Sequence, residues 1–172
     1  MRQQRETYQA ALVTGASRGL GRAFVEALPD DTDLVLTART RDELDAVATT
    51  CARPGRRIET IAADLTRASD QKSVIRAARA CDVDRVIANA GVGSFGKFVE
   101  SDVAAHMAAV RLNIESTLTI AHALLPDMIQ QARTAHRRAG LVVVSSSTAF
   151  APVPKFAVYA ATKSFLLSWS EA

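Results

Sequence analysis

Short apolar runs alternate along the chain with longer stretches in which apolar residues recur every three or four positions. A short apolar run bounded by turn residues is typical of a buried strand, and the longer spacing is typical of a helix. These patterns predict strands at residues 10–14, 33–37, 58–62, 85–88 and 141–145. Strands that alternate with helices indicate repeated β-α-β units, and hence a parallel sheet covered by helices on both faces.

Three helices are predicted in the first half of the chain. The first has a single apolar stripe, which consists of Leu20, Phe24 and Leu28 and stops at Pro29. Thr40 and Glu43 have the spacing of a capping box, which marks the start of the second helix. The third helix is predicted over residues 68–80.

The longest helical stretch runs from about residue 101 to residue 133. Its apolar positions are Val103, Met107, Val110, Ile114, Leu118, Leu125 and Ile129. They are too widely distributed for one narrow stripe, so we expect burial on more than one side, against the sheet and against a partner subunit. A homo-oligomer, dimer or tetramer, is therefore expected.

Composition supports one domain over residues 1–172. Of the 172 residues, 48% are hydrophobic but only 5% are aromatic, a balance that suits small side chains packed between helices and a sheet. The net charge of +3 comes from 21 basic residues interleaved with 18 acidic ones. The densest basic stretch, residues 133–138, has no interleaved aromatics for base stacking. We therefore interpret it as a solvated loop and expect no nucleic-acid partner.

The cysteines and the N-terminal residues indicate a reducing compartment. Cys51 and Cys81 form no CxxC pair and have no histidine at metal-ligand spacing, so neither a disulfide framework nor a metal site is expected. Residues 1–9 are polar, and the apolar run after them is too short for a signal or membrane segment. We expect a cytoplasmic protein without a membrane partner.

A glycine-rich segment, residues 14–21, follows the first predicted strand and opens the first helix. Its candidate cofactor-binding residues are Gly15, Ser17, Arg18, Gly19, Leu20 and Gly21. Glycines let the backbone approach a pyrophosphate, and free N–H groups at the helix start meet its charge. A tight strand-to-helix connection would use the same residues, but the rest of the chain favours a Rossmann-type, doubly wound parallel sheet that binds a dinucleotide.

The residues after the second strand indicate which dinucleotide is bound. Ala38 occupies the position where an acidic residue would hold the ribose hydroxyls of NAD, and Arg39 follows it. Arg18 and Arg39 together are suited to clamp a 2'-phosphate, because guanidinium groups bind phosphate oxygens in a fork. The alternative is two unrelated surface arginines. We expect NADP(H) as the cofactor.

Two further turns fall at the carboxyl edge of the predicted sheet, where ligands of open α/β sheets bind. Asp64 and Leu65 follow the third strand and are suited to the amino group and ring face of an adenine. Asn89, Ala90 and Gly91 follow the fourth strand. These residues are candidates for the remaining contacts with the cofactor.

Tyr159 and Lys163 are four residues apart in the last helical pattern, so their side chains share one helix face. By chance, such a pair is often a half-buried ring and a solvated amine. Here a serine run, residues 145–147, closes the fifth predicted strand upstream. The three features therefore meet at the carboxyl edge of the sheet.

In order and spacing, these motifs resemble the short-chain dehydrogenase/reductase family over essentially the whole chain. The motifs are Thr14-Gly15-x-x-x-Gly19-x-Gly21, Asn89-Ala90-Gly91, Asn113, Ser146 and Tyr159-x-x-x-Lys163. The resemblance implies hydride transfer between NADP(H) and a small-molecule carbonyl or alcohol substrate. The alternative is a catalytically weak NADP(H)-binding or scaffold protein of the same fold.

The resemblance also implies a role for each catalytic candidate. Tyr159 would be the general acid/base, and the Lys163 ammonium would favour its phenolate and hold the nicotinamide ribose. Ser146 would hydrogen-bond the reacting oxygen. Asn113 would hold a water that links Lys163 to solvent, although a polar residue tolerated within a helix is an equal interpretation of that position.

The chain departs from the family pattern in three respects. Ala88 replaces a common asparagine and Ala149 a common glycine, but neither change removes a reacting group. The last helix continues to Ala172 without a cap, whereas relatives continue through a further strand and a loop that covers the nicotinamide. We therefore expect the 172-residue chain to be unstable or oligomer-dependent, with little dehydrogenase activity.

Overall fold

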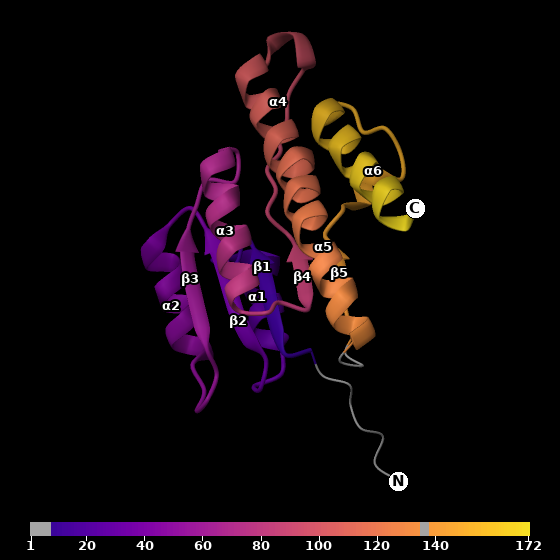
Figure 1. Cartoon of the computed structure of the whole chain (residues 1–172). Coiled ribbons are helices and arrows are strands. Elements are labelled where there is room, and N and C mark those ends of the chain that lie inside the picture. Colours follow the sequence, from indigo (N-terminus) through magenta and orange to yellow (C-terminus); the bar gives the residue numbers. More distant parts are fainter. Residues whose placement is uncertain (1–7, 135–137) are drawn as a thin grey trace.

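A computed structural model describes residues 8–134 and 138–172. In these residues, five parallel strands form one sheet in the order β3-β2-β1-β4-β5 (Figure 1). The strands are β1 (Ala10–Thr14), β2 (Asp33–Ala38), β3 (Ile58–Ala62), β4 (Arg85–Ala88) and β5 (Gly140–Val143). The predicted fold class is confirmed, and only β5 ends earlier than its sequence pattern predicts.

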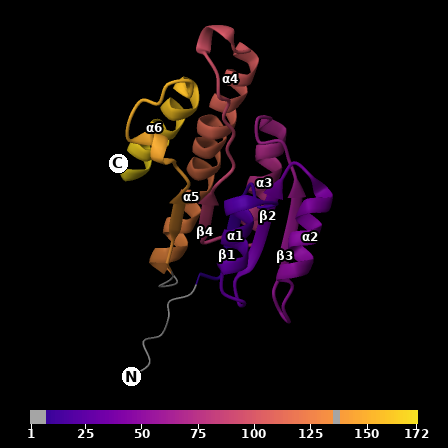
Figure 2. The same ribbon diagram turned by 180° about the vertical axis from the view of Figure 1, so that it is seen from behind.

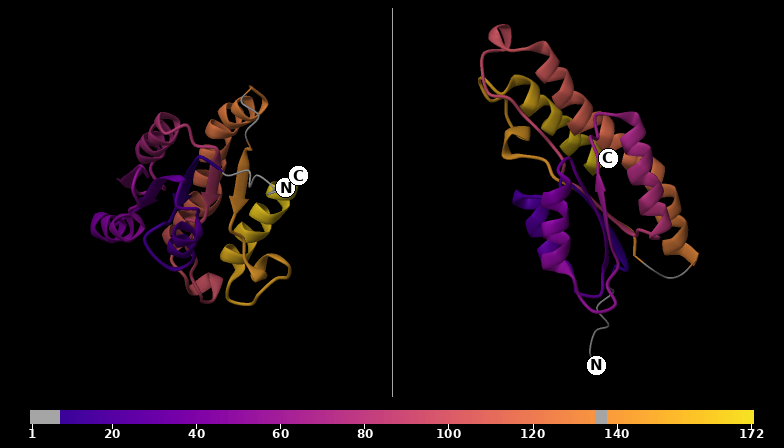
Figure 3. Two further views of the ribbon diagram at one scale, coloured as in Figure 1. Left: turned by 90° about the horizontal axis from the view of Figure 1, so that it is seen from below. Right: turned by 90° about the vertical axis from the view of Figure 1, so that its left-hand side faces the viewer.

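Helices cover both faces of this sheet, as two further views show (Figures 2 and 3). The helices are α1 (Gly19–Ala27), α2 (Arg41–Cys51), α3 (Ala68–Ala80), α4 (Val103–Val110), α5 (Ser116–Thr134) and α6 (Ala157–Glu171). Shorter elements are the 3₁₀ helices η1 (Phe98–Glu100) and η3 (Ser147–Ala149) and the π-helix η2 (Arg111–Glu115). Helices α4 and α6 reach above the carboxyl ends of the strands (Figure 1).

Alternation along the strands builds a core on each face of the sheet. Leu12 of β1 lies opposite Val35 of β2 and Val86 of β4, and all three are buried against α3 and α5. The next residue, Val13, is paired with Leu36 of β2 and packs in the other core, against α1 and α2. Successive strand residues point to opposite faces, so each strand contributes to both cores.

The strand order reverses between β1 and β4. The chain moves outward from β1 to β3, then returns to place β4 on the other side of β1. In open α/β sheets, ligands bind outside the carboxyl ends of the strands at such a reversal. Gly15 follows β1 and Asn89 follows β4, so two of the motifs found in the sequence meet at this position.

The long helical stretch consists of α4, η2 and α5 in succession. It begins at Val103, because the Asp102 carboxylate caps it by accepting a hydrogen bond from the Ala104 N–H at 2.9 Å. The sequence did not predict the π turn, which contains Asn113. Single π turns within α-helices often occur at functional sites.

The apolar positions of this stretch are only partly buried within the chain. Val103 is 68% exposed, Met107 46% and Ile129 44%. The residues that face the interior are mostly small or polar, and include His106, Ala109, Asn113, Ser116, Thr117 and Ala121. Small side chains allow α4 to approach α6 closely, so apolar character alone did not identify the inward face. Burial against a partner subunit stays a prediction.

At the starts of α1 and α2, the structure departs from the sequence prediction in two places. Thr40 precedes α2, but its side chain makes no capping hydrogen bond, so the capping box is not formed. Leu20 is 64% exposed, whereas Gly21 and Val25 are buried. Leu28 is buried and Phe24 packs against the same core, so only Leu20 departs from the predicted stripe. Gly21 takes its place, because it lies against the turn that follows β1.

The composition also led to expectations about the basic stretch, the two cysteines and membrane-spanning segments. Arg133 and Arg138 of the basic stretch are exposed, and residues 135–137 lie outside the described residues. Cys51 is buried, Cys81 is partly buried, and both are free thiols. In the described part of the chain, no helix combines the length and apolar character needed to cross a membrane.

Candidate active site

The turn between β1 and α1 forms an open cradle of backbone. Gly15 and Gly19 have φ angles of +66° and +56°, a backbone region that residues other than glycine rarely adopt. A Cβ atom on Gly21 would lie 2.0 Å from the carbonyl oxygen of Gly15, whereas one on Gly19 would meet nothing within 4 Å. Arg18 precedes α1 without capping it through its side chain. The first N–H groups of α1 are therefore available to an anion.

The segments after β1 and β4 are locked together by Thr14 and Asn89. The Thr14 hydroxyl accepts hydrogen bonds from the backbone N–H groups of Asn89 and Ala90, at 3.0 and 2.9 Å. The Asn89 amide donates to the carbonyl oxygens of Thr14 and Gly15, at 2.9 and 3.2 Å. Asn89 thus holds the shape of the cradle. Thr14 belongs to the glycine motif, but its locking role was not predicted, although its place at the end of a strand, before Gly15, was a usable signal.

The ends of β2 and β3 place charged groups at the same edge of the sheet. Arg39 is exposed directly after β2. The Asp64 carboxylate accepts hydrogen bonds from the Thr66 hydroxyl at 2.7 Å and the Thr66 N–H at 3.0 Å. These bonds hold the pKa of Asp64 below its usual value, with smaller contributions from the positive charges of Arg67 and Arg39.

Leu65 differs from its expected role. Its side chain is only 4% exposed and packs in the core with α3 and α5. Its carbonyl oxygen accepts a hydrogen bond from the Gln71 amide at 2.7 Å. The side chain therefore offers little surface to an adenine ring, which leaves the backbone and Asp64 as the groups at this position.

Tyr159 and Lys163 lie one turn apart on α6, with the Lys163 amine near the Tyr159 ring. Lys163 is 3% exposed, and its Nζ donates a hydrogen bond to the Val144 carbonyl oxygen at 2.8 Å. The same Nζ lies 5.8 Å from the centroid of the Tyr159 ring. Burial lowers the pKa of Lys163. The Ser145 hydroxyl donates to the Lys163 carbonyl oxygen at 2.8 Å, which ties the end of β5 to α6.

Two glycines after β4 bring the backbone against this pair. A Cβ on Gly91 would lie 3.2 Å from Lys163 Nζ and 3.3 Å from Asn113 Oδ1. A Cβ on Gly93 would lie 2.4 Å from the Tyr159 ring. Neither position has room for a larger side chain without displacing a candidate catalytic group. Gly93 was not among the predicted site residues, although it is a second glycine two residues after the Asn-Ala-Gly motif.

Asn113 connects the loop after β4 to α6. It is fully buried, and its Oδ1 accepts a hydrogen bond from the Val92 N–H at 2.9 Å. Its Nδ2 donates to the Val92 carbonyl oxygen and to the Thr162 hydroxyl, both at 2.9 Å. Thr162 is the residue before Lys163, and its hydroxyl donates in turn to the Tyr159 carbonyl oxygen at 2.8 Å. Asn113 therefore positions the segment that carries both candidate catalytic groups.

Ser146 lies directly before η3, after the end of β5. Its hydroxyl oxygen accepts hydrogen bonds from the Thr148 N–H at 3.2 Å and the Thr148 hydroxyl at 2.9 Å. Both bonds use the oxygen as acceptor, so the Ser146 hydroxyl proton is left to donate elsewhere. This is the polarity required to hydrogen-bond a substrate oxygen.

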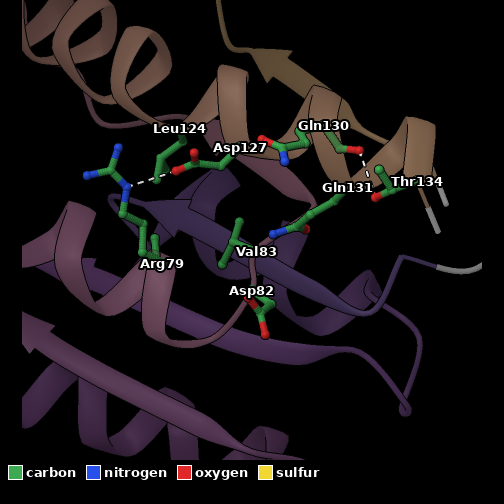
Figure 4. Close-up of a pocket in the computed structure, with 9 residues that line it drawn as sticks. Arg79, Asp82, Val83, Leu124, Asp127, Gln130, Gln131 and Thr134 are labelled. Carbon is green, nitrogen blue, oxygen red and sulfur yellow. Dashed lines mark hydrogen bonds and ion pairs between the residues drawn. The ribbon is translucent and has the colours of Figure 1, made fainter.

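Two cavities lie outside this arrangement. One, of about 340 Å³, lies between the C-terminal ends of α3 and α5, and Figure 4 shows the Arg79–Asp127 ion pair (2.9 Å) at its side. It is at the amino edge of the sheet, opposite Tyr159 and Lys163. The other, of about 570 Å³, lies between residues 149–155 and α6. No group of three or more His, Cys, Asp or Glu side chains in the described ranges is placed to hold a metal ion.

Comparison with known proteins agrees with this geometry. The family described as short chain dehydrogenase matches residues 9–172. A very-long-chain 3-oxoacyl-CoA reductase from Phaeosphaeria nodorum is 31% identical over 171 residues, which cover 94% of this chain and 48% of that relative. This chain thus spans about half the length of that curated relative.

Solved structures give the same result. A short-chain dehydrogenase from Sphingobium yanoikuyae in complex with NADPH has a TM-score of 0.85 and 32% identity, covering 95% of this chain and 63% of that one. A short chain dehydrogenase/reductase from Burkholderia phymatum in complex with NAD has a TM-score of 0.86 and 24% identity, covering 98% and 60%, which shows the shared fold. The family match covers nearly the whole chain, and the chain therefore belongs to the short chain dehydrogenase family of oxidoreductases.

Proposed function

We propose that this chain binds NADP(H) and catalyses hydride transfer between it and a carbonyl or alcohol substrate. The observation that carries the proposal is the buried Lys163 ammonium, whose Nζ lies 5.8 Å from the Tyr159 ring centroid at the same sheet edge as the glycine cradle. A buried amine is costly to keep, so its place beside a phenol favours a chemical role.

The residues of the cradle fit a dinucleotide. Gly15 and Gly19 hold an open turn, and the first turn of α1 presents uncapped N–H groups to a pyrophosphate. Arg18 and Arg39 are exposed, and Ala38 leaves no carboxylate to repel a 2'-phosphate. The similar Sphingobium enzyme was solved with NADPH, whereas the Burkholderia fold neighbour was solved with NAD. The fold thus accommodates either cofactor, and the two arginines support NADP(H).

NADPH, when bound, supplies the hydride that the carbonyl carbon accepts. The Tyr159 hydroxyl donates its proton to the carbonyl oxygen, and in the reverse direction the Tyr159 phenolate takes the proton from the alcohol. The Lys163 ammonium stabilises the negative charge left on Tyr159, and the Ser146 hydroxyl donates a hydrogen bond to the same substrate oxygen. Asn113 holds Val92 and Thr162, and thereby fixes the position of α6.

The cofactor part is tested by fluorescence titration with NADPH and NADH. We expect NADPH to bind about tenfold more tightly or better, because two guanidinium groups are available to the 2'-phosphate. Equal affinities, or a preference for NADH, would contradict this assignment.

The chemical part is tested by NADPH oxidation with a panel of ketones and aldehydes. Tyr159→Phe should lose most turnover and keep its NADPH affinity, because the hydroxyl acts on the substrate. Tyr8→Phe is the matched control, since Tyr8 packs on Arg85 at the opposite edge of the sheet. Because little dehydrogenase activity is expected of the 172-residue chain, each variant is compared with the low turnover of the unchanged chain. Turnover by Tyr159→Phe equal to that of the unchanged chain would refute the mechanism, and NADPH binding with no detectable turnover at all would refute the enzyme function.

A further inference from the structure

We propose that Phe95 and Phe156 form an aromatic platform beside Tyr159 that selects carbonyl substrates with a flat aromatic group on the reacting carbon. This inference rests on the proposed function and names the substrate class of that site. Phe95 lies in the loop between β4 and η1, and Phe156 is the residue before α6. Neither residue was predicted from the sequence to belong to the site.

The rings form a row that leads away from Tyr159. The Phe156 ring centroid lies 5.7 Å from that of Tyr159, with an interplanar angle of 52°. The Phe95 centroid lies 5.0 Å from that of Phe156, at 56°. These separations are within the range in which aromatic rings attract one another. A group bound against the Tyr159 ring thus has further aromatic surface beside it.

The two loops that carry the platform are joined by their backbones. The Gly96 N–H donates a hydrogen bond to the Lys155 carbonyl oxygen at 2.9 Å. Lys155 has a φ angle of +67°, a left-handed conformation that is strained for a residue with a side chain. Strain of this kind is concentrated at functional sites, where the surrounding structure maintains it. Here it accompanies the contact that holds Phe95 against Phe156.

Further contacts fix the loop on the N-terminal side of Phe95. Asn113 holds both backbone groups of Val92, and Gly93 lies against the Tyr159 ring. The Ser94 hydroxyl lies 3.5 Å from Nδ1 of the buried His106. Phe95 is thus preceded and followed by anchored residues.

Phe95 is nevertheless 65% exposed. A single exposed phenylalanine is ordinary, but this one is held in place by its neighbours and is one ring away from Tyr159. The Lys155 ammonium lies 5.5 Å from the Phe95 centroid, where a cation is attracted to the face of a ring. A preorganised, exposed ring in such a position is suited to receive an aromatic group of a ligand.

The test compares three ketones at saturating NADPH: acetophenone, cyclohexyl methyl ketone and 2-butanone. The first two have similar size, but only acetophenone has a flat aromatic group. We expect Phe95→Ala to lower kcat/KM for acetophenone by about tenfold and to change that for 2-butanone by less than about twofold. Phe95→Leu keeps an apolar side chain but no ring. It should therefore lower kcat/KM for acetophenone more than kcat/KM for the cyclohexyl ketone.

Phe165→Ala is the matched control, because Phe165 is 40% exposed on α6 and belongs to none of these ring contacts. It should leave the preference among the three ketones unchanged. Equal losses for all three ketones in Phe95→Ala, or no preference for acetophenone over 2-butanone in the unchanged chain, would overturn the platform.

Measuring acetophenone binding directly distinguishes failure of the aromatic platform from failure of the proposed function. If NADPH binds but no ketone is turned over, the proposed function fails, and saturation-transfer NMR with acetophenone still decides the platform. Binding by the unchanged chain and by Tyr159→Phe, with loss in Phe95→Ala, supports it. Absence of acetophenone binding to the NADPH-loaded chain overturns it.

Discussion

Replacing Asn113 by alanine should loosen the connection between the loop after β4 and α6. The side chain is fully buried and makes hydrogen bonds to the Val92 N–H, the Val92 carbonyl oxygen and the Thr162 hydroxyl. Asn113→Ala removes all three. The expected consequences are lower stability and lower turnover, because Gly93 and Tyr159 depend on the same contacts for their positions.

The magnitude follows from the exposure of the groups left behind. Three hydrogen bonds at roughly 0.5–1.5 kcal/mol each amount to about 1.5–4.5 kcal/mol. Val92 is 44% exposed, so water is able to replace part of the lost bonding there. Thr162 keeps its hydrogen bond to the Tyr159 carbonyl oxygen. We therefore expect a loss of about 2 kcal/mol, which for a chain of this size lowers Tm by roughly 4–8 °C.

Urea unfolding and thermal melting of Asn113→Ala, Thr162→Val and the double variant measure this effect. Coupling between the two sites of about 1 kcal/mol is expected, because the residues share one hydrogen bond. Thr119→Ala, at an exposed position on α5, is the control and should change stability by less than about 0.5 kcal/mol.

A loss of stability in Asn113→Ala no greater than that in Thr119→Ala would refute this role of Asn113. The role is equally refuted if the effects of Asn113→Ala and Thr162→Val simply add. In either case the hydrogen bonds would not hold the loop to the helix. Should Asn113→Ala fail to fold, Thr162→Val alone still provides the comparison with the control.

Three further predictions concern charge, backbone and assembly. Burial lowers the pKa of Lys163 below its ordinary 10.5, so the unfolded chain binds this proton more tightly than the folded one. The contribution of Lys163 to stability should therefore increase as the pH rises toward 10.5, and Lys163→Met should lose that increase. Urea unfolding of both proteins at several pH values checks this. Equal slopes of unfolding free energy against pH in the two proteins would be the contrary result. Gly21→Ala should abolish NADPH binding or folding, because its Cβ would lie 2.0 Å from a carbonyl oxygen, whereas Gly19→Ala costs only about 1–2 kcal/mol of backbone strain. Circular dichroism and NADPH titration compare the two variants, and equal loss in both would contradict this prediction. The chain should form a homo-oligomer through exposed apolar positions of α4 and α5, so Met107→Glu and Ile129→Glu should lower the mass measured by light scattering, and an unchanged mass would argue against this surface.

The sequence alone determined the strands, the parallel sheet and the family. Five short runs and their spacing predicted the five described strands. The central strands β1, β2 and β4 are mostly buried and apolar, whereas the edge strand β3 is only partly buried and includes Glu59 and Thr60. The glycine motif identified the turn after β1, since Gly15 and Gly19 adopt conformations that other residues rarely tolerate. Tyr159 and Lys163 were recognisable because a four-residue spacing places two side chains on one helix face.

Helix faces and starts were less predictable. The apolar pattern assigned Leu20, Val103 and Met107 to buried faces, but within the chain all three are exposed. Close contacts between backbone segments, as at Gly21, decide which face of a helix is buried. A capping residue such as Thr40 has the right chemistry, but only the local geometry determines whether its hydrogen bond forms.

Only the tertiary structure decided how the site is held together. Val92 of the loop after β4, Asn113 of η2 and Thr162 of α6 meet in space, and no local pattern indicates such a meeting. The same is true of Phe95 and Phe156, which are 61 residues apart in the chain and have ring centroids 5.0 Å apart. Local propensity depends on neighbours in the sequence, whereas these contacts join segments that are far apart in it. The packing of the helices on the sheet decides where those segments lie.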